Sequence, residues 1–228
     1  QTRGAPGLPG VTTHERSPGW QFSAAGRTLP QEDRDYPEWH LGRMHYGVWL
    51  IDADMGAVRE RITQAQAHLA PLLVHHQRQP HITLFVCGFV ADVVAHGDDF
   101  TPDMLAAQQA ALQALQLEPF TLQIGAIDSF DSAVFLRVDD PDNGLAPLRH
   151  ALGQGTREIR QSAYVPHLTV GLYSGAFDKE LVEGKLQSFA SHTPIPLRVQ
   201  RIHFARYEAR VLGGPLQLCH THLLHTPS

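Results

Sequence analysis

The chain has few cysteines, no excess of basic residues and no long apolar run. Cys87 and Cys219 are its two cysteines in 228 residues, so we expect free thiols in a reducing, cytoplasmic compartment, with one disulfide as the alternative. The absence of a run of about 18 apolar residues argues against a membrane-spanning helix. The formal net charge is −5, so neither a membrane nor long duplex DNA is an expected partner.

Histidine is abundant, with 15 residues, but its spacing matches no zinc motif. The pair His75-His76 and the stretch Cys219 to His222 contain metal-ligand residue types without a recognised arrangement. The sequence therefore predicts no metal site and no cofactor. A histidine-rich metal-binding protein is a competing interpretation, and it would be revealed by elemental analysis.

The composition is that of a globular protein, with 43% hydrophobic and 18% charged residues. Residues 1–36 are rich in Gly, Pro, Ser and Thr and show little periodicity, which predicts an irregular N-terminal extension. We interpret residues 37–228 as a single two-lobed domain. One lobe covers 37–117 plus part of the C-terminus, and the other covers 118–228. A monomer is expected.

Hydrophobic periodicity and turn residues predict an alternation of strands and helices. Helix caps are expected at Asp54 and at Thr101, where Pro102 follows. The expected strands are 46–51, 81–89, 120–127, 133–138, 164–172, 195–207 and 215–224. The expected helices are 54–73, 102–115, 145–152 and 178–190.

Two of the expected strands begin with nearly the same residues. Pro80-His81-Ile82-Thr83-Leu84 is followed 86 positions later by Pro166-His167-Leu168-Thr169-Val170. Because alternate strand residues point to opposite faces, each motif shows its histidine and threonine on one face and apolar residues on the other. A single His-x-Thr is common, and a lone strand histidine is usually structural. Two copies at matching places favour a function.

The order strand, helix, His-x-Thr strand, helix, strand occurs in each half of the chain, which indicates an internal duplication. Two similar halves related by a pseudo-twofold axis would bring His81 and His167 together across one cleft. One neutral and one protonated imidazole can take a proton from an attacking oxygen and give one to a leaving oxygen. Thr83 and Thr169 can donate to the non-bridging oxygens of a phosphate. A metal-free reaction at a phosphoester is therefore the preferred chemistry.

On these two motifs and the strand–helix order around them, residues 41–225 resemble the two-histidine (2H) phosphoesterase superfamily, nearest to its bacterial 2′-5′ RNA ligase and cyclic phosphodiesterase branch. The resemblance implies a bilobal α+β fold, with two antiparallel-rich sheets facing a central cleft and helices outside. It implies RNA ends with 2′,3′-cyclic phosphates, cyclic nucleotides or 2′-5′ linkages as substrates. It also assigns catalysis to His81 and His167 and phosphate contacts to Thr83 and Thr169. Where family members often carry an aromatic residue near the C-terminus, this chain has Gly213-Gly214-Pro215-Leu216.

Further residues are candidates for binding the substrate. Strict alternation places Phe85 on the His81 face and Tyr173 on the His167 face, where either ring could stack on a base or fill core. Gly171 would leave room for a phosphate or a sugar. Arg78, three residues before His81, could reach a phosphate or lie solvated at the surface.

Weaker candidates remain beside these. Arg43 and Arg206 could also reach a phosphate, whereas Trp39 and Tyr46 are interpreted as core. No carboxylate is placed so that it would orient either histidine.

The preferred function is hydrolysis of 2′,3′-cyclic phosphodiesters or of 2′-5′ linkages. Ligation is the same chemistry with a sugar 5′ hydroxyl as nucleophile. Which histidine is the acid and which the base stays open, since two neighbouring imidazoles titrate as a pair. The alternative function is a module that binds a nucleotide or an RNA end in the same cleft without turning it over.

Overall fold

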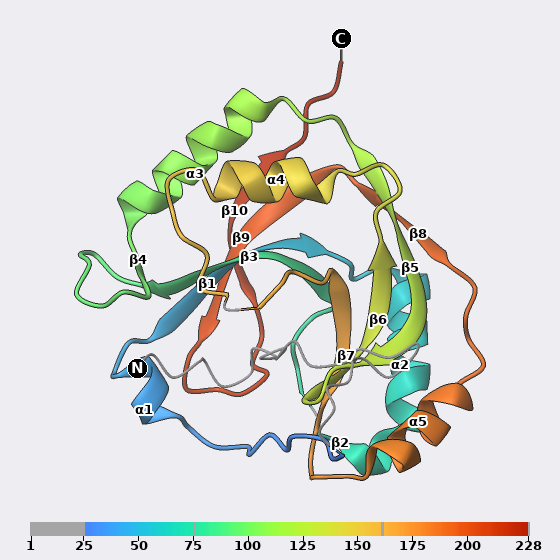
Figure 1. The fold of residues 1–228 in the computed structure, drawn as a ribbon. Coiled ribbons are helices and arrows are strands. Elements are labelled where there is room, and N and C mark those ends of the chain that lie inside the picture. The colour runs from blue at the N-terminus through green and yellow to red at the C-terminus, as the bar shows by residue number, and fades with distance from the viewer. Residues whose placement is uncertain (1–25, 75, 161, 228) are drawn as a thin grey trace.

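One curled sheet carries the fold, and helices pack against it (Figure 1). The computed structural model describes residues 26–74, 76–160 and 162–227. Within these residues ten strands form a single sheet, whose main path runs β10-β9-β1-β3-β7-β6-β5-β8. Its neighbours along this path are antiparallel, while the short β4 joins β3 in parallel. The expected α+β class is confirmed.

The elements follow one another closely along the chain. The strands are β1 (His45–Asp52), β2 (Leu73–Val74), β3 (His81–Val90), β4 (Asp99–Phe100), β5 (Phe120–Ser129), β6 (Ala133–Asp139), β7 (His167–Tyr173), β8 (Ile195–Val199), β9 (Arg201–Glu208) and β10 (Gln217–Leu223). The helices are α1 (Pro37–His40), α2 (Gly56–His68), the 3₁₀ turn η1 (Ala70–Leu72), α3 (Pro102–Leu115), α4 (Leu145–Leu152) and α5 (Lys179–Gln187).

The sheet has two four-stranded halves that meet at the centre. Strands β10-β9-β1-β3 form one half and β7-β6-β5-β8 form the other. The described contact between them in the sheet is the pairing of Ile82 on β3 with Leu168 on β7. The two sheets expected from the family resemblance are thus joined edge to edge at the two His-x-Thr strands.

The helices cover the halves in pairs. In Figure 1, α3 and α4 lie together over the half that contains β1 and β3, while α2 and α5 lie beside β5, β6 and β7. α2 precedes β3 in the chain but packs on the other half. Its Arg61 donates hydrogen bonds to the carbonyls of Ile124 and Gly125 on β5 and of Thr193. Of the two helices that cover each half of the sheet, one therefore comes from the part of the sequence that forms the other half.

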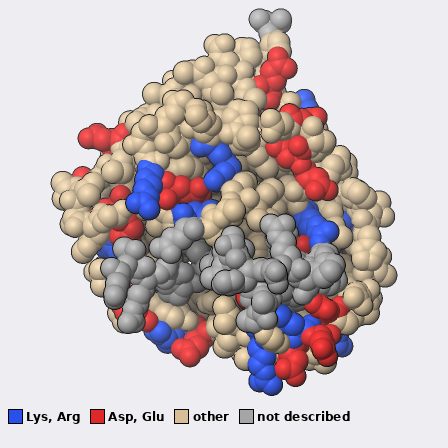
Figure 2. Space-filling view, viewed as in Figure 1, with Lys and Arg blue, Asp and Glu red and all other residues tan. Residues whose placement is uncertain are grey.

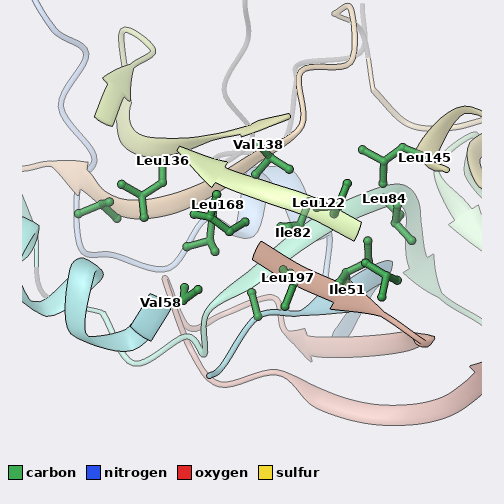
Figure 3. Close-up of a cluster of buried hydrophobic side chains, with 14 of the residues drawn as sticks. Ile51, Val58, Ile82, Leu84, Leu122, Leu136, Val138, Leu145, Leu168 and Leu197 are labelled. Carbon is green, nitrogen blue, oxygen red and sulfur yellow. The ribbon is translucent and has the colours of Figure 1, made fainter. Parts of the chain in front are cut away.

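The larger of two buried apolar clusters lies behind both halves. Ile82 and Leu168 are fully buried in it, together with residues of α2, α4, β5, β6 and β8. Figure 3 shows these side chains converging between the strands and the helices. Since His81 and His167 each precede one of these core residues, their side chains leave the sheet on the opposite face.

Several predicted boundaries agree with the structure and others do not. The helix at 145–152 is confirmed, and so is the one at 102–115, whose Thr101 cap accepts from the backbone N–H of Met104 at 3.4 Å. The predicted cap at Asp54 is wrong, because the N-cap residue of α2 is Met55 and it makes no side-chain cap bond. The predicted helix 54–73 ends at His68, since Pro71 follows and the chain turns into η1 and β2.

The predicted strand 195–207 is two strands. β8 pairs with β5 at one edge of the sheet, while β9 pairs with β1 in the other half. The chain crosses from one half of the sheet to the other at Gln200, the single residue between β8 and β9. Apolar residues occupy odd positions in β8, at Ile195, Leu197 and Val199, and even positions in β9, at Ile202 and Phe204. The alternation therefore changes phase at Gln200-Arg201, and the prediction of one continuous strand overlooked this break.

The described end of the N-terminal extension packs on the β7 half. The backbone N–H groups of Thr28, Leu29 and Gln31 donate to carbonyls of Phe177, Asp131 and Tyr173. Residues 1–25 of the predicted extension lie outside the described residues. In the part of the chain that is described, every helix is too short or too polar to cross a lipid bilayer.

Removing the side chain at the junction should destabilise the whole fold. Ile82 is 0% exposed, so Ile82→Ala leaves a cavity and should lower the free energy of unfolding by about 2–5 kcal/mol. The control Val93→Ala, at a side chain that is 73% exposed, should change it by less than about 0.5 kcal/mol. Urea unfolding followed by circular dichroism measures both. Equal stability of the two variants would contradict a core shared across the junction.

Candidate active site

The two repeated motifs line one pocket. His81 and Thr83 on β3, and His167 and Thr169 on β7, all contribute side chains to a cavity of about 120 Å³. All four side chains are half-buried, between the solvent and the core behind the sheet. The duplication inferred from the sequence therefore corresponds to two strands that meet at one cavity.

The register between β3 and β7 arranges these four side chains. Ile82 pairs with Leu168 in an antiparallel register, so each motif histidine lies across from the threonine of the other strand. The two histidines are then diagonal neighbours, which in a regular sheet are about 7–8 Å apart, with their Cβ atoms somewhat closer. Both side chains line the same cavity.

Backbone carbonyls orient both imidazole rings in the same way. Nδ1 of His81 lies 2.8 Å from the carbonyl oxygen of Gln79, and Nδ1 of His167 lies 2.7 Å from that of Val165. A carbonyl oxygen accepts hydrogen bonds and cannot donate them, so each Nδ1 carries a proton. In the neutral ring Nε2 is then unprotonated, and no described residue hydrogen-bonds to either Nε2.

Both imidazoles are held in the neutral form. Burial lowers the pKa of His81 to about 4, helped by the positive charge of Arg78 and by the neighbouring His167. Burial likewise lowers the pKa of His167 to about 4, helped by Arg160. A bound anion would oppose these effects, because it stabilises an imidazolium.

Aromatic rings support His167 from the side. The centroid of its ring lies 5.0 Å from that of Phe130 and 5.4 Å from that of Phe135, both in edge-to-face geometry. Together with the bond from Nδ1 to a carbonyl, these contacts hold the ring in one orientation, which acid–base chemistry requires.

Arg78 lies at the pocket, as the sequence analysis proposed. It lines the cavity next to His81, its guanidinium lies 4.0 Å from the ring centroid of Tyr207, and its Nε donates to the carbonyl of Gly214 at 3.1 Å. Burial lowers its pKa. In the described residues no carboxylate pairs with it, so an anion in the pocket would be its counter-charge.

Phe85 and Tyr173 lie away from the pocket, so placing them on the histidine faces was wrong. They are 2% and 0% exposed and pack in the core. Each motif strand has a bulge just after its threonine, because Leu84 in β3 and Val170 in β7 are extra residues with no counterpart in the neighbouring strands β1 and β6. A bulge shifts the alternation by one position and turns the later side chains to the other face.

Gly171 does not give the pocket extra room. A Cβ at this position would lie 3.0 Å from the side chain of Leu73 on β2, so the small residue permits close packing of two strands. Because of the bulge, the neighbouring Leu172 lines the pocket in its place.

The weaker arginine candidates are engaged elsewhere. Arg43 pairs with Asp98 and Asp99, and Arg206 donates to the side chain of Gln217. Neither lines the pocket. Figure 2 shows acidic and basic side chains interspersed on the visible face, without one broad basic surface.

Several pocket residues were not found from the sequence. Trp39, interpreted as core, lines the cavity, and so do Tyr36, His76, Arg160 and the stretch 211–213 of the loop between β9 and β10. For Tyr36 and Trp39, the cluster of aromatic residues just before the first strand was a sequence feature that could have indicated a place at the pocket. Arg160 lies in an irregular segment, and no motif distinguishes it.

Comparison with known proteins identifies the family of this chain. The family model described as the 2′-5′ RNA ligase superfamily matches residues 55–210. The chain belongs to this superfamily. The resemblance inferred from the two motifs is thereby confirmed.

Solved structures show the same fold as this superfamily member. Escherichia coli LigT, in a complex with 3′-AMP, has a TM-score of 0.57 and 16% sequence identity, covering 80% of this chain and 99% of LigT. A structure described as a phosphoesterase has a TM-score of 0.51 and 17% identity, covering 80% and 99%. A protein of Thermus thermophilus has a TM-score of 0.52 and 14% identity, covering 78% and 97%. The search of curated proteins found no match.

In this 2′-5′ RNA ligase superfamily member, the other histidines and cysteines within the described residues do not gather into a donor cluster. No group of three or more His, Cys, Asp or Glu side chains in the described ranges is placed to hold a metal ion. Cys87 is buried, Cys219 is exposed, and both are free thiols. His76 lines the pocket, while His75 lies outside the described residues.

The state of the two pocket histidines can be measured directly. We expect both rings to titrate near pH 4 in the folded protein, because burial disfavours the charged ring, and near about 6.5 after unfolding in urea. Nitrogen-detected NMR should show the proton on Nδ1 in the neutral form. Titration near 6.5 in the folded state, or a proton on Nε2, would contradict the described geometry.

Proposed function

We propose that this chain is a metal-independent phosphodiesterase acting on RNA-type substrates with a 2′,3′-cyclic phosphate or a 2′-5′ linkage. One observation carries the proposal. Two imidazoles from duplicated strands line a single pocket, each with Nδ1 bonded to a carbonyl and Nε2 left for chemistry. That arrangement supports general acid–base catalysis on both sides of one phosphorus atom.

In this mechanism one histidine acts as the base and the other as the acid. One neutral Nε2 accepts a proton from the attacking water, whose oxygen forms the new bond to phosphorus. The other histidine, as imidazolium, donates its proton to the ribose oxygen that leaves as the ring opens. The two histidines together carry one proton before and after the reaction. The net result is therefore the addition of one water molecule across the bond between phosphorus and the leaving ribose oxygen.

The remaining polar groups supply charge compensation. The hydroxyls of Thr83 and Thr169 can donate to the non-bridging oxygens, which stay negative throughout the reaction. The cation of Arg78 lines the same cavity as these hydroxyls. An anionic phosphate also raises the pKa of the buried imidazoles, so substrate binding itself helps to protonate one of them.

The superfamily and one structural relative support the proposed substrate class. LigT of Escherichia coli has been solved with 3′-AMP bound, and a nucleotide-sized phosphoester is the corresponding ligand here. Ligation would use the same groups, with a 5′ hydroxyl of a second RNA end attacking in place of water. Both reactions need the same acid and the same base.

Loss of either histidine should remove most of the activity. His81→Ala and His167→Ala should each lower the rate of ring opening of 2′,3′-cyclic AMP by at least about 10²-fold, because each removes one proton-transfer group. Chromatography of the opened nucleotide measures the rate, and circular dichroism checks that both variants are folded.

The matched control is His192→Ala, since this histidine is exposed and lies outside the pocket. It should retain the wild-type rate. All assays contain EDTA, and the wild-type rate should survive it. Binding of the cyclic nucleotide without ring opening would identify a binding module, and recovery of a lost rate by a divalent ion would reject the metal-free mechanism.

The pH dependence should differ between the free and the occupied site. Reaction requires one proton on the pair, and in the free protein both pKa values are about 4. kcat/KM should therefore fall as the pH rises above about 5, whereas kcat should persist to higher pH because bound phosphate raises both pKa values. Steady-state kinetics between about pH 4 and pH 9 test this. A kcat/KM that is constant across neutral pH would contradict it.

A further inference from the structure

Two arginines share one carboxylate at the edge of the pocket. Glu158, in the segment between α4 and β7, pairs with Arg149 at 2.7 Å and with Arg160 at 3.2 Å. The Glu158 carboxylate also accepts a hydrogen bond from the backbone N–H of Val86. These contacts lower its pKa, although burial alone would raise it. Three charged side chains thus form a partly buried cluster with two positive charges and one negative charge.

The two arginines use their nitrogens differently. The terminal nitrogens of Arg149 donate to both oxygens of Glu158 and to the carbonyl of Leu84. Arg160 donates to Glu158 through Nε. No described residue accepts a hydrogen bond from the terminal nitrogens of Arg160. Both terminal nitrogens of Arg149 are therefore engaged, whereas the terminal nitrogens of Arg160, the fork of its guanidinium, have no acceptor among the described residues.

The position of Arg160 places this fork at the site. Its side chain is 9% exposed and it lines the pocket that contains both histidines. It is close enough to His167 for its charge to lower the pKa of that ring. Arg149, by contrast, does not line the pocket.

The backbone around Arg160 is fixed before any ligand arrives. Glu158 accepts a hydrogen bond from the backbone N–H of Val86 at 3.1 Å, and the N–H of Ile159 donates to the carbonyl of Val86 at 3.0 Å. These bonds fasten the segment to β3 next to its bulge. A guanidinium held in place in this way loses little freedom when it binds an oxyanion.

The cluster lacks one negative charge. A partly buried cation without a counter-charge is unfavourable, and a guanidinium with two free terminal nitrogens matches the geometry of two phosphate oxygens. We propose that Arg160 binds non-bridging oxygens of the reacting phosphate beside His167. Arg78, from another part of the chain, lines the same pocket near His81. The inference rests on the proposed function in that the substrate is a phosphodiester.

The test compares Arg160→Met with Arg157→Met. Arg157 is an exposed residue three positions earlier in the same segment and does not line the pocket, so its variant controls for loss of charge in that region. Calorimetry with inorganic phosphate should show affinity reduced about 10- to 100-fold for Arg160→Met and unchanged for Arg157→Met. Arg160→Lys keeps the charge without the fork and should lie between wild type and Arg160→Met.

Kinetics identify the phosphate that is bound. With 2′,3′-cyclic AMP, which has a single phosphate, Arg160→Met should lose about 10- to 100-fold in kcat/KM. If the loss appears only when the substrate also carries a 5′-phosphate, Arg160 binds a neighbouring phosphate and the assignment to the reacting one is overturned. In NMR titrations the pKa of His167 should rise in Arg160→Met more than that of His81.

Failure of this inference and failure of the proposed function give different results. If wild type opens the cyclic nucleotide and Arg160→Met equals Arg157→Met in phosphate affinity and in kcat/KM, the role of Arg160 is refuted while the function stands. If wild type opens no ring but its affinity for inorganic phosphate still depends on Arg160, the function fails and the phosphate site stands. Unfolding midpoints measured for each variant ensure that the comparison is made between folded proteins, and Arg160→Lys replaces Arg160→Met if the latter does not fold.

Discussion

The pairing of Ile82 with Leu168 is the contact on which the rest of the structure depends. It joins the two halves of the sheet, and both side chains are buried in one core behind it. An antiparallel register at this point sets the flanking residues face to face, so the two histidines and the two threonines meet on the opposite side. The core that stabilises the fold and the pocket that carries the candidate chemistry are thus two faces of the same strand pair.

The bulges after the two threonines limit how far each motif reaches along the pocket. They lie at Leu84 and Val170, which are equivalent positions of the duplicated halves. Before each bulge a strand presents its histidine and threonine to the pocket, and after it the large aromatic side chains turn into the core. Bulges are frequent next to active sites, where they redirect a side chain. Here the same device occurs in both halves.

The surroundings of the two histidines are less symmetric than the strands. Arg78 precedes His81 by three residues and is held by a carbonyl and a tyrosine ring. Arg160 belongs to an irregular segment and is held by a carboxylate that it shares with a second arginine. The duplication therefore accounts for the two histidines and the two threonines of the candidate site. The cations around them are supplied by unrelated parts of the chain.

Local patterns in the sequence were sufficient to find the two repeated motifs and most elements, since a repeated tripeptide, helix caps and hydrophobic periodicity depend on neighbouring residues. They correctly led to α3, α4 and the superfamily. Alternation failed at Phe85 and Tyr173, because a bulge depends on which strand lies alongside. Alternation changes phase at Gln200-Arg201 between β8 and β9, but a change of phase does not reveal that the chain moves to the other half of the sheet. The position of Arg160 follows from contacts with β3, which is more than 70 residues away in the chain. Pairing, bulges and distant ion pairs are set by the energy of the assembled sheet, and only the tertiary structure contains that information.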